Sequence, residues 1–294
     1  MVNKKLKEYI DGCKLIKYND CFYIRMSDDI LEKYKSGIYD RELDNFNRAI
    51  LDIEKLGTVY PNNERPIFYL YMVPFDNYKE LLDFPACFDL GKGGGKPVDS
   101  FESNGFDYAL GYSENLFVNR KQTISKYANT LHEVAHLVNS KFCNKNRFIH
   151  EGFADAVAFY SFDMESKFEQ HFDMIKNLTE DDIYSVKDLL RAEDSDEFDS
   201  ISIMPAINCS FVKGYVSSYL FTRVILEQIE LKYGVSRYEA TNIYLNMLNN
   251  ELHSEGLVEY LSNKLDLSFD ILYEDKDYQF QVINGLKKDK TDRR

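Results

Sequence analysis

Apolar positions in the first part of the chain follow two different periods. The stretch CFYIRMS, Cys21–Ser27, alternates apolar and polar residues and predicts a short strand. The next stretch, YDRELDNFNRAILDIEKLG, carries apolar residues at intervals of three and four, which predicts an amphipathic helix that ends at Gly57. RPIFYLYMV, Arg65–Val73, is rich in strand-forming residues and predicts a buried strand. The apolar residues of the predicted helix are Leu43, Phe46, Ile50, Ile53 and Leu56.

A short helical piece near Leu81 is followed by a glycine-rich stretch, DLGKGGGKPVDS, which predicts a loop. This stretch does not match a phosphate-binding loop, because Leu90 stands where the first glycine of GxxxxGK[ST] belongs and Pro97 follows Lys96. Two interpretations stay open for it, a flap near a substrate cleft and an ordinary mobile loop. Two extended segments, FDYALGYS and NLFVNR, then predict a hairpin.

Beyond Phe159 the pattern is almost wholly helical. The clearest helix is FVKGYVSSYLFTRVILEQIELKYG, which we expect to end at Gly234. RYEATNIYLNMLNN and EGLVEYLSNKL predict two more helices, and the acidic run RAEDSDEFDS, Arg191–Ser200, predicts a solvated loop. The pattern therefore predicts an α+β protein, with a small mixed β-sheet in its first half and mainly helices in its second.

The composition of the chain limits which partners the protein can bind and in which cellular compartment we expect it. Hydrophobic residues make up 44% and charged residues 29%, as in ordinary globular proteins. The net charge of −13 disfavours nucleic acid and anionic membranes as partners. The alternative interpretation is that this charge only keeps the protein soluble. There is no signal-peptide core and no run of about 20 apolar residues. Because the five cysteines form no CxxC pair, we expect a cytoplasmic protein with reduced thiols, while export without a signal stays open.

The stretch TISKYANTLHEVAHLVNS predicts a helix with a histidine pair on one face. His132 and His136 are four residues apart, so both imidazoles can grip one metal ion from the same side. Glu133 lies about 100° further round the helix, within reach of a metal-bound water without being a ligand itself. This is the HExxH pattern of zinc hydrolases. The apolar stripe of the predicted helix consists of Ile124, Ala128, Leu131, Val134, Ala135 and Val138.

A catalytic zinc ion needs a third protein ligand, and the amphipathic segment FIHEGFADAVAFY offers one. Glu151 is the favoured candidate, and Asp155 lies one turn further along the same face, where it can accept the outer N–H of a zinc-bound imidazole. His150 is the rival ligand; because adjacent helical residues point about 100° apart, His150 and Glu151 are not expected to bind one ion together. We expect an apolar face to pack into the core, formed by Phe148, Phe153, Val157 and Phe159.

HEVAH together with HEGFAD resembles the gluzincin metallopeptidases, the thermolysin and aminopeptidase N-like superfamily. EGFAD is similar to the NEGFA run of the aminopeptidase branch and to the Glu-xxx-Asp of the thermolysin branch. The resemblance implies zinc bound by His132, His136 and Glu151, with Glu133 as general base. It also implies a mixed sheet whose edge strand lies along the cleft above the active-site helix, and GYSENLFVN sits where that strand would be.

The resemblance extends roughly over residues 65–234 and is strongest from Leu131 to Asp155. The chain departs from the aminopeptidase branch because no GxMxN motif precedes the helix. It also departs from the metzincin signature, since Asn139 and Phe142 occupy the glycine and histidine positions. An endopeptidase is therefore favoured over an aminopeptidase.

Gluzincins often place a tyrosine or histidine from a later helix over the scissile carbonyl. KGYVSSYLFTRVILEQIELKYG resembles that helix, which makes Tyr215 the candidate oxyanion donor and Tyr219 its rival. For either tyrosine, simple packing in the core is an equally open interpretation.

We therefore expect three regions: a strand and helix region at 1–60, a zincin-like catalytic core at 61–165, and a helical part at 166–294 that completes the cleft. The expected function is zinc-dependent hydrolysis of peptide or protein substrates, with Glu133 activating a zinc-bound water. Two alternatives stay open. One is a catalytically inactive zincin-fold module that binds metal or a protein partner, and the other is a helical interaction protein without metal.

Overall fold

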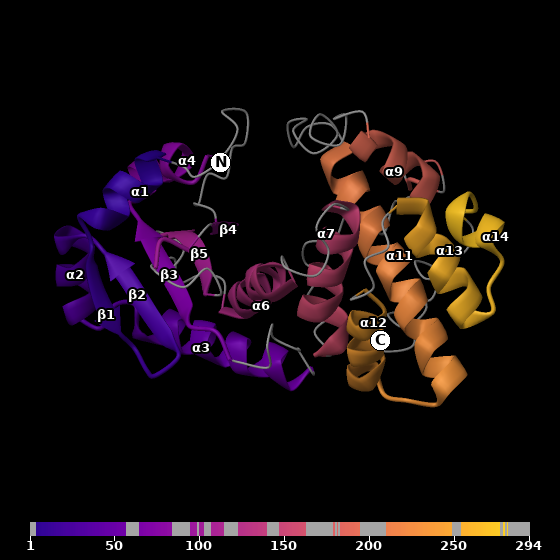
Figure 1. Cartoon of the computed structure of the whole chain (residues 1–294), viewed down its shortest axis with the longest axis horizontal. Coiled ribbons are helices and arrows are strands. Elements are labelled where there is room, and N and C mark those ends of the chain that lie inside the picture. The colour runs from indigo at the N-terminus through magenta and orange to yellow at the C-terminus, as the bar shows by residue number, and fades with distance from the viewer. Residues whose placement is uncertain are drawn as a thin grey trace, which may run out of the picture. The chain divides into compact units, whose positions relative to one another are not determined.

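The chain forms two compact units, Met1–Val138 and Asn139–Arg294. The computed structural model describes residues 4–56, 65–83, 95–98, 100–102, 107–114, 123–139, 147–162, 179, 181, 183–194, 210–248, 254–276, 279 and 281. The first unit contains the sheet, and the described elements of the second unit are helices (Figure 1). The α+β class predicted from the sequence is confirmed, and the three-part division of the chain stays a prediction.

The described part of the first unit is built on a five-stranded mixed sheet with the order β1-β2-β3-β5-β4. The three central strands are parallel, and each edge strand is antiparallel to its neighbour. All side chains of β3 and β5 are buried, as expected for interior strands with both faces covered. The strands are β1 (Lys14–Lys17), β2 (Phe22–Met26), β3 (Phe68–Val73), β4 (Gly95–Val98) and β5 (Tyr108–Ser113).

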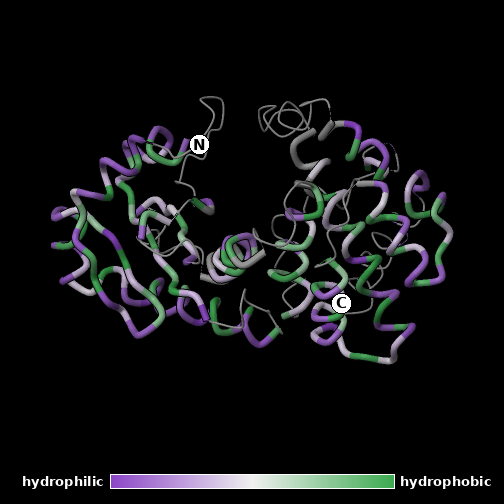
Figure 2. The backbone as a smooth tube through the Cα atoms, in the orientation of Figure 1, coloured by the Kyte–Doolittle hydropathy of each residue, from purple (hydrophilic) through white to green (hydrophobic). Residues whose placement is uncertain are grey.

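Helices cover both faces of this sheet. On one face, α1 (Lys4–Asp11) and α4 (Tyr78–Leu81) pack against alternate residues of β3 and β5 around Tyr71. On the other face, the buried residues of α3 (Asp40–Lys55) are mostly apolar, and hydrophobic and hydrophilic residues alternate along this helix (Figure 2). The Phe46 ring of α3 stacks on Phe22 at 6.1 Å and meets the Tyr112 ring edge-on at 5.5 Å. A further helix, α2 (Asp28–Lys35), follows β2.

The helix with the histidine pair, α6 (Thr123–Asn139), is attached to α3 through Tyr127. The Tyr127 hydroxyl donates to the Asp52 carboxylate at 2.5 Å, and the Arg48 guanidinium lies over the tyrosine ring, 4.9 Å from its centroid. The two helices therefore hold each other by one polar and one cation–π contact.

In the second unit, α7 (Arg147–Asp155) runs on into a π-helical turn, η3 (Ala156–Ser161). From Phe148 to Ser161 every side chain is buried except that of His150, so this segment is a core helix. It packs against α11 (Ser210–Tyr233) and α12 (Arg237–Leu248) through ring contacts, including Phe148 on Phe221. The remaining helices are α9 (Val186–Asp194), α13 (Ser254–Leu265) and α14 (Phe269–Tyr273).

Most elements predicted from periodicity are present. The strand at Cys21–Ser27, the helix before Gly57, the strand at Arg65–Val73 and the helical piece near Leu81 correspond to β2, α3, β3 and α4. The three predicted helices of the second half correspond to α11, α12 and α13, and α11 ends at Tyr233, directly before Gly234.

Three details of the prediction are wrong. The end of the glycine-rich stretch is not a loop, because Gly95–Val98 pairs with β5 as strand β4. The segment expected at the sheet edge contains Gly111–Ser113, which belong to the interior strand β5 and pair with β3. Residues Arg191–Asp194, expected in a loop, complete helix α9. The strand NLFVNR, the other half of the predicted hairpin, lies outside the described residues.

Among the helices that the structure describes, none combines the length and the apolar character needed to cross a membrane.

Candidate metal centre

The geometry of α6 places the two histidines side by side. His132 and His136 are one helical turn apart, and their Nε2 atoms lie 2.9 Å from each other. The rings are nearly perpendicular, with an interplanar angle of 86°. Both side chains are half-buried, whereas the described aliphatic residues of the same helix are buried. The described residues of the predicted stripe, Ala128, Leu131, Val134 and Ala135, are all in the core, while the side chains of Ile124 and Val138 are outside the described part.

Glu151 supplies the third group. Its side chain is 8% exposed and lies on α7, and it joins the histidines as the only group of three possible metal ligands found among the described residues. One ligand atom from each of His132, His136 and Glu151 lies within 4.8 Å of the other two. His150, directly before Glu151, is half-buried and not part of this group.

The donor set fits a divalent metal ion. Two imidazole nitrogens and a carboxylate are a common set of protein ligands for a catalytic zinc ion. Ligands bound tetrahedrally at about 2.0–2.1 Å lie roughly 3.3 Å apart, so donors separated by 2.9–4.8 Å meet one ion after movements of up to about 1.5 Å. The same donors also suit other transition metals. The group could therefore hold a metal ion, and its composition alone leaves the identity of the metal open.

Glu133 lies next to His132 on α6 and is half-buried. Its carboxylate is close enough to β5 to act on Tyr112: burial raises the pKa of Tyr112, and the negative charges of Glu133 and Glu42 raise it further. A hydrogen bond with the Thr130 side chain opposes this rise. The predicted general base therefore lies in the neighbourhood of a buried phenol that the sequence analysis did not single out. No local pattern signals this proximity, because the two residues belong to different elements.

Asp155 lies one turn after Glu151 on α7 and is 7% exposed. The predicted contact of Asp155 with a zinc-bound imidazole stays a prediction. Ala154 is fully buried, as are the four apolar residues expected to face the core, Phe148, Phe153, Val157 and Phe159.

The two tyrosines considered as oxyanion donors both lie on α11. Tyr219 is only 1% exposed and belongs to the core, which favours packing as its role. The side chain of Tyr215 is outside the described part of the structure, so its assignment stays a prediction. Gly91, Gly93 and Gly94 of the glycine-rich stretch are outside it as well.

The fold and the site together define an α+β protein with a His–His–Glu group that could hold a metal ion. Comparison with family models, with curated proteins and with solved structures finds no match to this chain.

Proposed function

We propose that the protein is a zinc-dependent peptidase of the gluzincin type, and an endopeptidase rather than an aminopeptidase. His132, His136 and Glu151 hold the zinc ion in this proposal. The observation that carries it is the convergence of these three donors within 4.8 Å, when two of them come from an HExxH helix and the third from a separate helix.

Glu133 is the general base of the proposed reaction. The chemistry that zinc supplies when bound is Lewis acidity, which lowers the pKa of a water molecule and polarises a peptide carbonyl. A carboxylate oxygen of Glu133 takes a proton from the attacking water and then delivers it to the nitrogen of the leaving amine. Tyr215 is the proposed donor of a hydrogen bond to the carbonyl oxygen as negative charge develops on it.

The resemblance to gluzincins implies an edge strand that aligns the substrate along the cleft, and β4 is the candidate for this strand. Within the described part, β4 lies at the end of the strand order and is antiparallel to β5, the strand that carries Tyr112 near Glu133. An extended peptide can add itself as a further strand at the end of a sheet. We therefore assign to β4 the role that the sequence analysis gave to GYSENLFVN.

The proposal has two competitors. A catalytically inactive zincin-fold module would bind metal or a protein partner, but it would not need a base beside the ligands, and Glu133 is present. A helical interaction protein without metal leaves the convergence of His132, His136 and Glu151 without a reason. The partners expected from the sequence, a peptide or protein substrate with neither nucleic acid nor membrane, belong to this proposal, as does the cytoplasmic location.

The proposal is tested by separating turnover from metal binding. Purified protein should contain about one zinc ion per molecule. The substitutions His132→Ala and Glu151→Gln should each abolish zinc binding or weaken it strongly. Glu133→Gln should keep the zinc ion and lose peptide cleavage by roughly 10²–10⁴-fold, measured with a quenched fluorescent peptide library. Glu259→Gln on α13, an exposed residue, is the matched control and should cleave like the wild type.

Two results would count against the peptidase. Equal cleavage by the Glu133→Gln protein and the wild type would remove Glu133 as the base. A zinc-loaded wild type that cleaves none of the peptides would favour the inactive metal-binding module instead.

A further inference from the structure

Helices α7 and α11 come unusually close at Gly152. A Cβ atom built on this glycine would lie 2.2 Å from the backbone carbonyl oxygen of Ser218 and 2.5 Å from Oγ1 of Thr222. Contacts below 3.0 Å are essentially never made by real Cβ atoms. Any other residue at this position therefore requires a helix to move, because the nearest obstacle is backbone and cannot rotate away.

The surroundings leave little room for such a movement. Ser218 and Thr222 are fully buried, and the Ser218 hydroxyl donates to the Gly214 carbonyl oxygen of its own helix at 2.9 Å. On either side of Gly152, α7 is held by buried rings: Phe148 packs on Phe221 of α11, and Phe153 packs on Tyr244 of α12. Close packing against α11 and α12 therefore leaves α7 little room to shift.

Gly152 directly follows Glu151 in the chain. Because adjacent helical residues are separated by about 1.5 Å along the axis, a displacement of α7 at Gly152 carries Glu151 with it. Relieving a 2.2 Å contact to an ordinary distance requires a shift of about 1.2–1.8 Å. Metal–ligand distances tolerate only about 0.2 Å of change. Glycine is also the least favourable residue within a helix apart from proline, so its place in the middle of a buried helix calls for a packing reason.

We propose that Gly152 is a positioning residue of the metal centre: its missing Cβ atom lets α7 lie against α11 at Ser218 and so places the Glu151 carboxylate for metal binding. The inference rests on the proposed function insofar as Glu151 is a zinc ligand. Gly152 acts through Glu151 and does not touch the ion itself.

The test is a double-mutant cycle on zinc affinity, measured by competition with a chromophoric chelator. Gly152→Ala should raise the zinc Kd at least 10-fold, and Glu151→Gln should raise it by a similar or larger factor. The double variant should bind no more weakly than Glu151→Gln alone, because the glycine acts only through that ligand. Absorption of the Co²⁺-loaded proteins should report the same change of coordination in Gly152→Ala and in Glu151→Gln.

Gly256→Ala on α13 is the matched control, since a Cβ atom there meets nothing within 4 Å. Its zinc Kd should equal that of the wild type. Thr222→Ile adds bulk opposite Gly152 from the α11 side and leaves α7 unchanged in sequence. Thr222→Ile should also raise the zinc Kd. If Gly152→Ala does not fold, the zinc Kd of Thr222→Ile tests the inference in its place.

The outcomes separate the inference from the function on which it rests. A folded Gly152→Ala protein with the wild-type zinc Kd would overturn the inference, even if its melting temperature falls, and so would additive losses in the double variant. If the wild type binds no zinc, or if Glu151→Gln binds it equally well, the proposed metal centre fails and the inference fails with it. Zinc binding that depends on Gly152 without peptide cleavage would refute the peptidase and leave the positioning role intact.

Discussion

Gly95 and Tyr112 lie opposite each other in the pairing of β4 with β5, and a Cβ atom on Gly95 would lie 2.1 Å from the Tyr112 ring. The ring has little freedom to turn aside, because it is buried and also meets the Phe46 ring edge-on, with centroids 5.5 Å apart. The edge strand can therefore pair with β5 at this position only because residue 95 has no side chain. The same tyrosine lies near Glu133, so a side chain at position 95 that displaced the Tyr112 ring would also alter the surroundings of the proposed base.

Gly95→Ala should destabilise the protein by about 1–3 kcal/mol, the usual cost of forcing extra atoms into a packed region. Chemical denaturation at neutral pH measures the loss. In a Tyr112→Leu background the obstructing ring is absent, and the same substitution should cost much less. An equal cost in both backgrounds would show that the contact with Tyr112 is not the cause.

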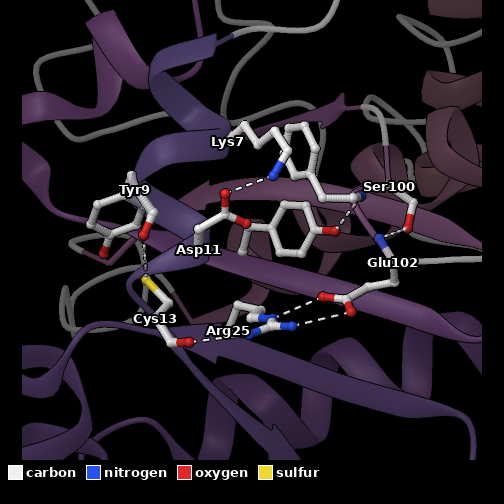
Figure 3. Close-up of polar contacts among 9 residues, drawn as sticks. Lys7, Tyr9, Asp11, Cys13, Arg25, Ser100 and Glu102 are labelled. Carbon is white, nitrogen blue, oxygen red and sulfur yellow. Dashed lines mark hydrogen bonds and ion pairs between the residues drawn. The ribbon is translucent and has the colours of Figure 1, made fainter.

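The segment that follows β4 is fastened to the sheet by an ion pair. Figure 3 shows the Arg25 guanidinium of β2 meeting the Glu102 carboxylate through two contacts, of 2.8 and 3.1 Å. Arg25 also donates to the Cys13 carbonyl oxygen, and the Phe101 backbone N–H donates to the Tyr71 hydroxyl at 3.0 Å. The pair is mostly shielded from water, with side chains 22% and 17% exposed, so it is screened less than a surface pair.

Glu102→Gln should therefore cost about 1–3 kcal/mol of unfolding free energy, because it leaves the shielded Arg25 charge without its counter-charge. Glu80→Gln removes the partner of Lys5 in an exposed pair with side chains 65% and 56% exposed, and should cost at most about 0.5 kcal/mol. Denaturation of both variants in low and high salt makes the comparison. Similar small losses in both would mean that shielding adds nothing to the Arg25–Glu102 pair.

Alkaline pH should destabilise the fold through buried tyrosines such as Tyr108. Burial raises the pKa of Tyr108 to about 12, while a phenol in the unfolded chain titrates near 10. Between these values the unfolded chain has released a proton that the folded protein retains, so stability falls as pH rises, by up to about 1.4 kcal/mol per pH unit for one such group. The contribution is fully present below about pH 10 and is lost towards pH 12.

Tyr108→Phe removes this titration while keeping the ring that stacks on Phe68. Its unfolding free energy should fall less than that of the wild type between about pH 9 and about pH 11.5. Tyr233→Phe, at an exposed position, is the control and should follow the wild type. A Tyr108→Phe protein with the wild-type pH dependence would contradict the prediction.

Zinc should stabilise the folded protein through the proposed ligands. At a free concentration 100 times its Kd, zinc should add about 2.7 kcal/mol to the unfolding free energy, because it binds the folded state selectively. His136→Ala should abolish this gain, and a chelator should reverse it in the wild type. A gain that survives in His136→Ala would place the bound zinc elsewhere.

Asp155→Asn should weaken zinc binding by about 10–100-fold, the usual effect of altering a group that orients a metal-bound imidazole. Asp270→Asn on α14, an exposed carboxylate, is the control and should leave the zinc Kd unchanged. An Asp155→Asn protein with unchanged zinc affinity would return Asp155 to a purely structural role on α7.

Periodicity and spacing determined much of this molecule by themselves. α3, β2 and β3 follow from local alternation or helical repeats, because burial of one face selects the residues that form it. The His132–His136 pair follows in the same way, since four residues make about one helical turn whatever surrounds the helix. The helical second half is likewise visible in the runs that became α11, α12 and α13.

Only the tertiary structure decided where distant segments meet. β4 is a strand because Gly95 allows the chain to lie against Tyr112, and no local propensity of a glycine-rich stretch indicates this. The sequence favoured Glu151 over His150 as the third ligand, and the group of possible metal ligands among the described residues contains Glu151 and not His150. No local pattern indicates the close approach of Gly152 to Ser218 and Thr222 of α11. Such contacts depend on packing between elements far apart in the chain, which a local pattern of apolar and polar residues does not encode.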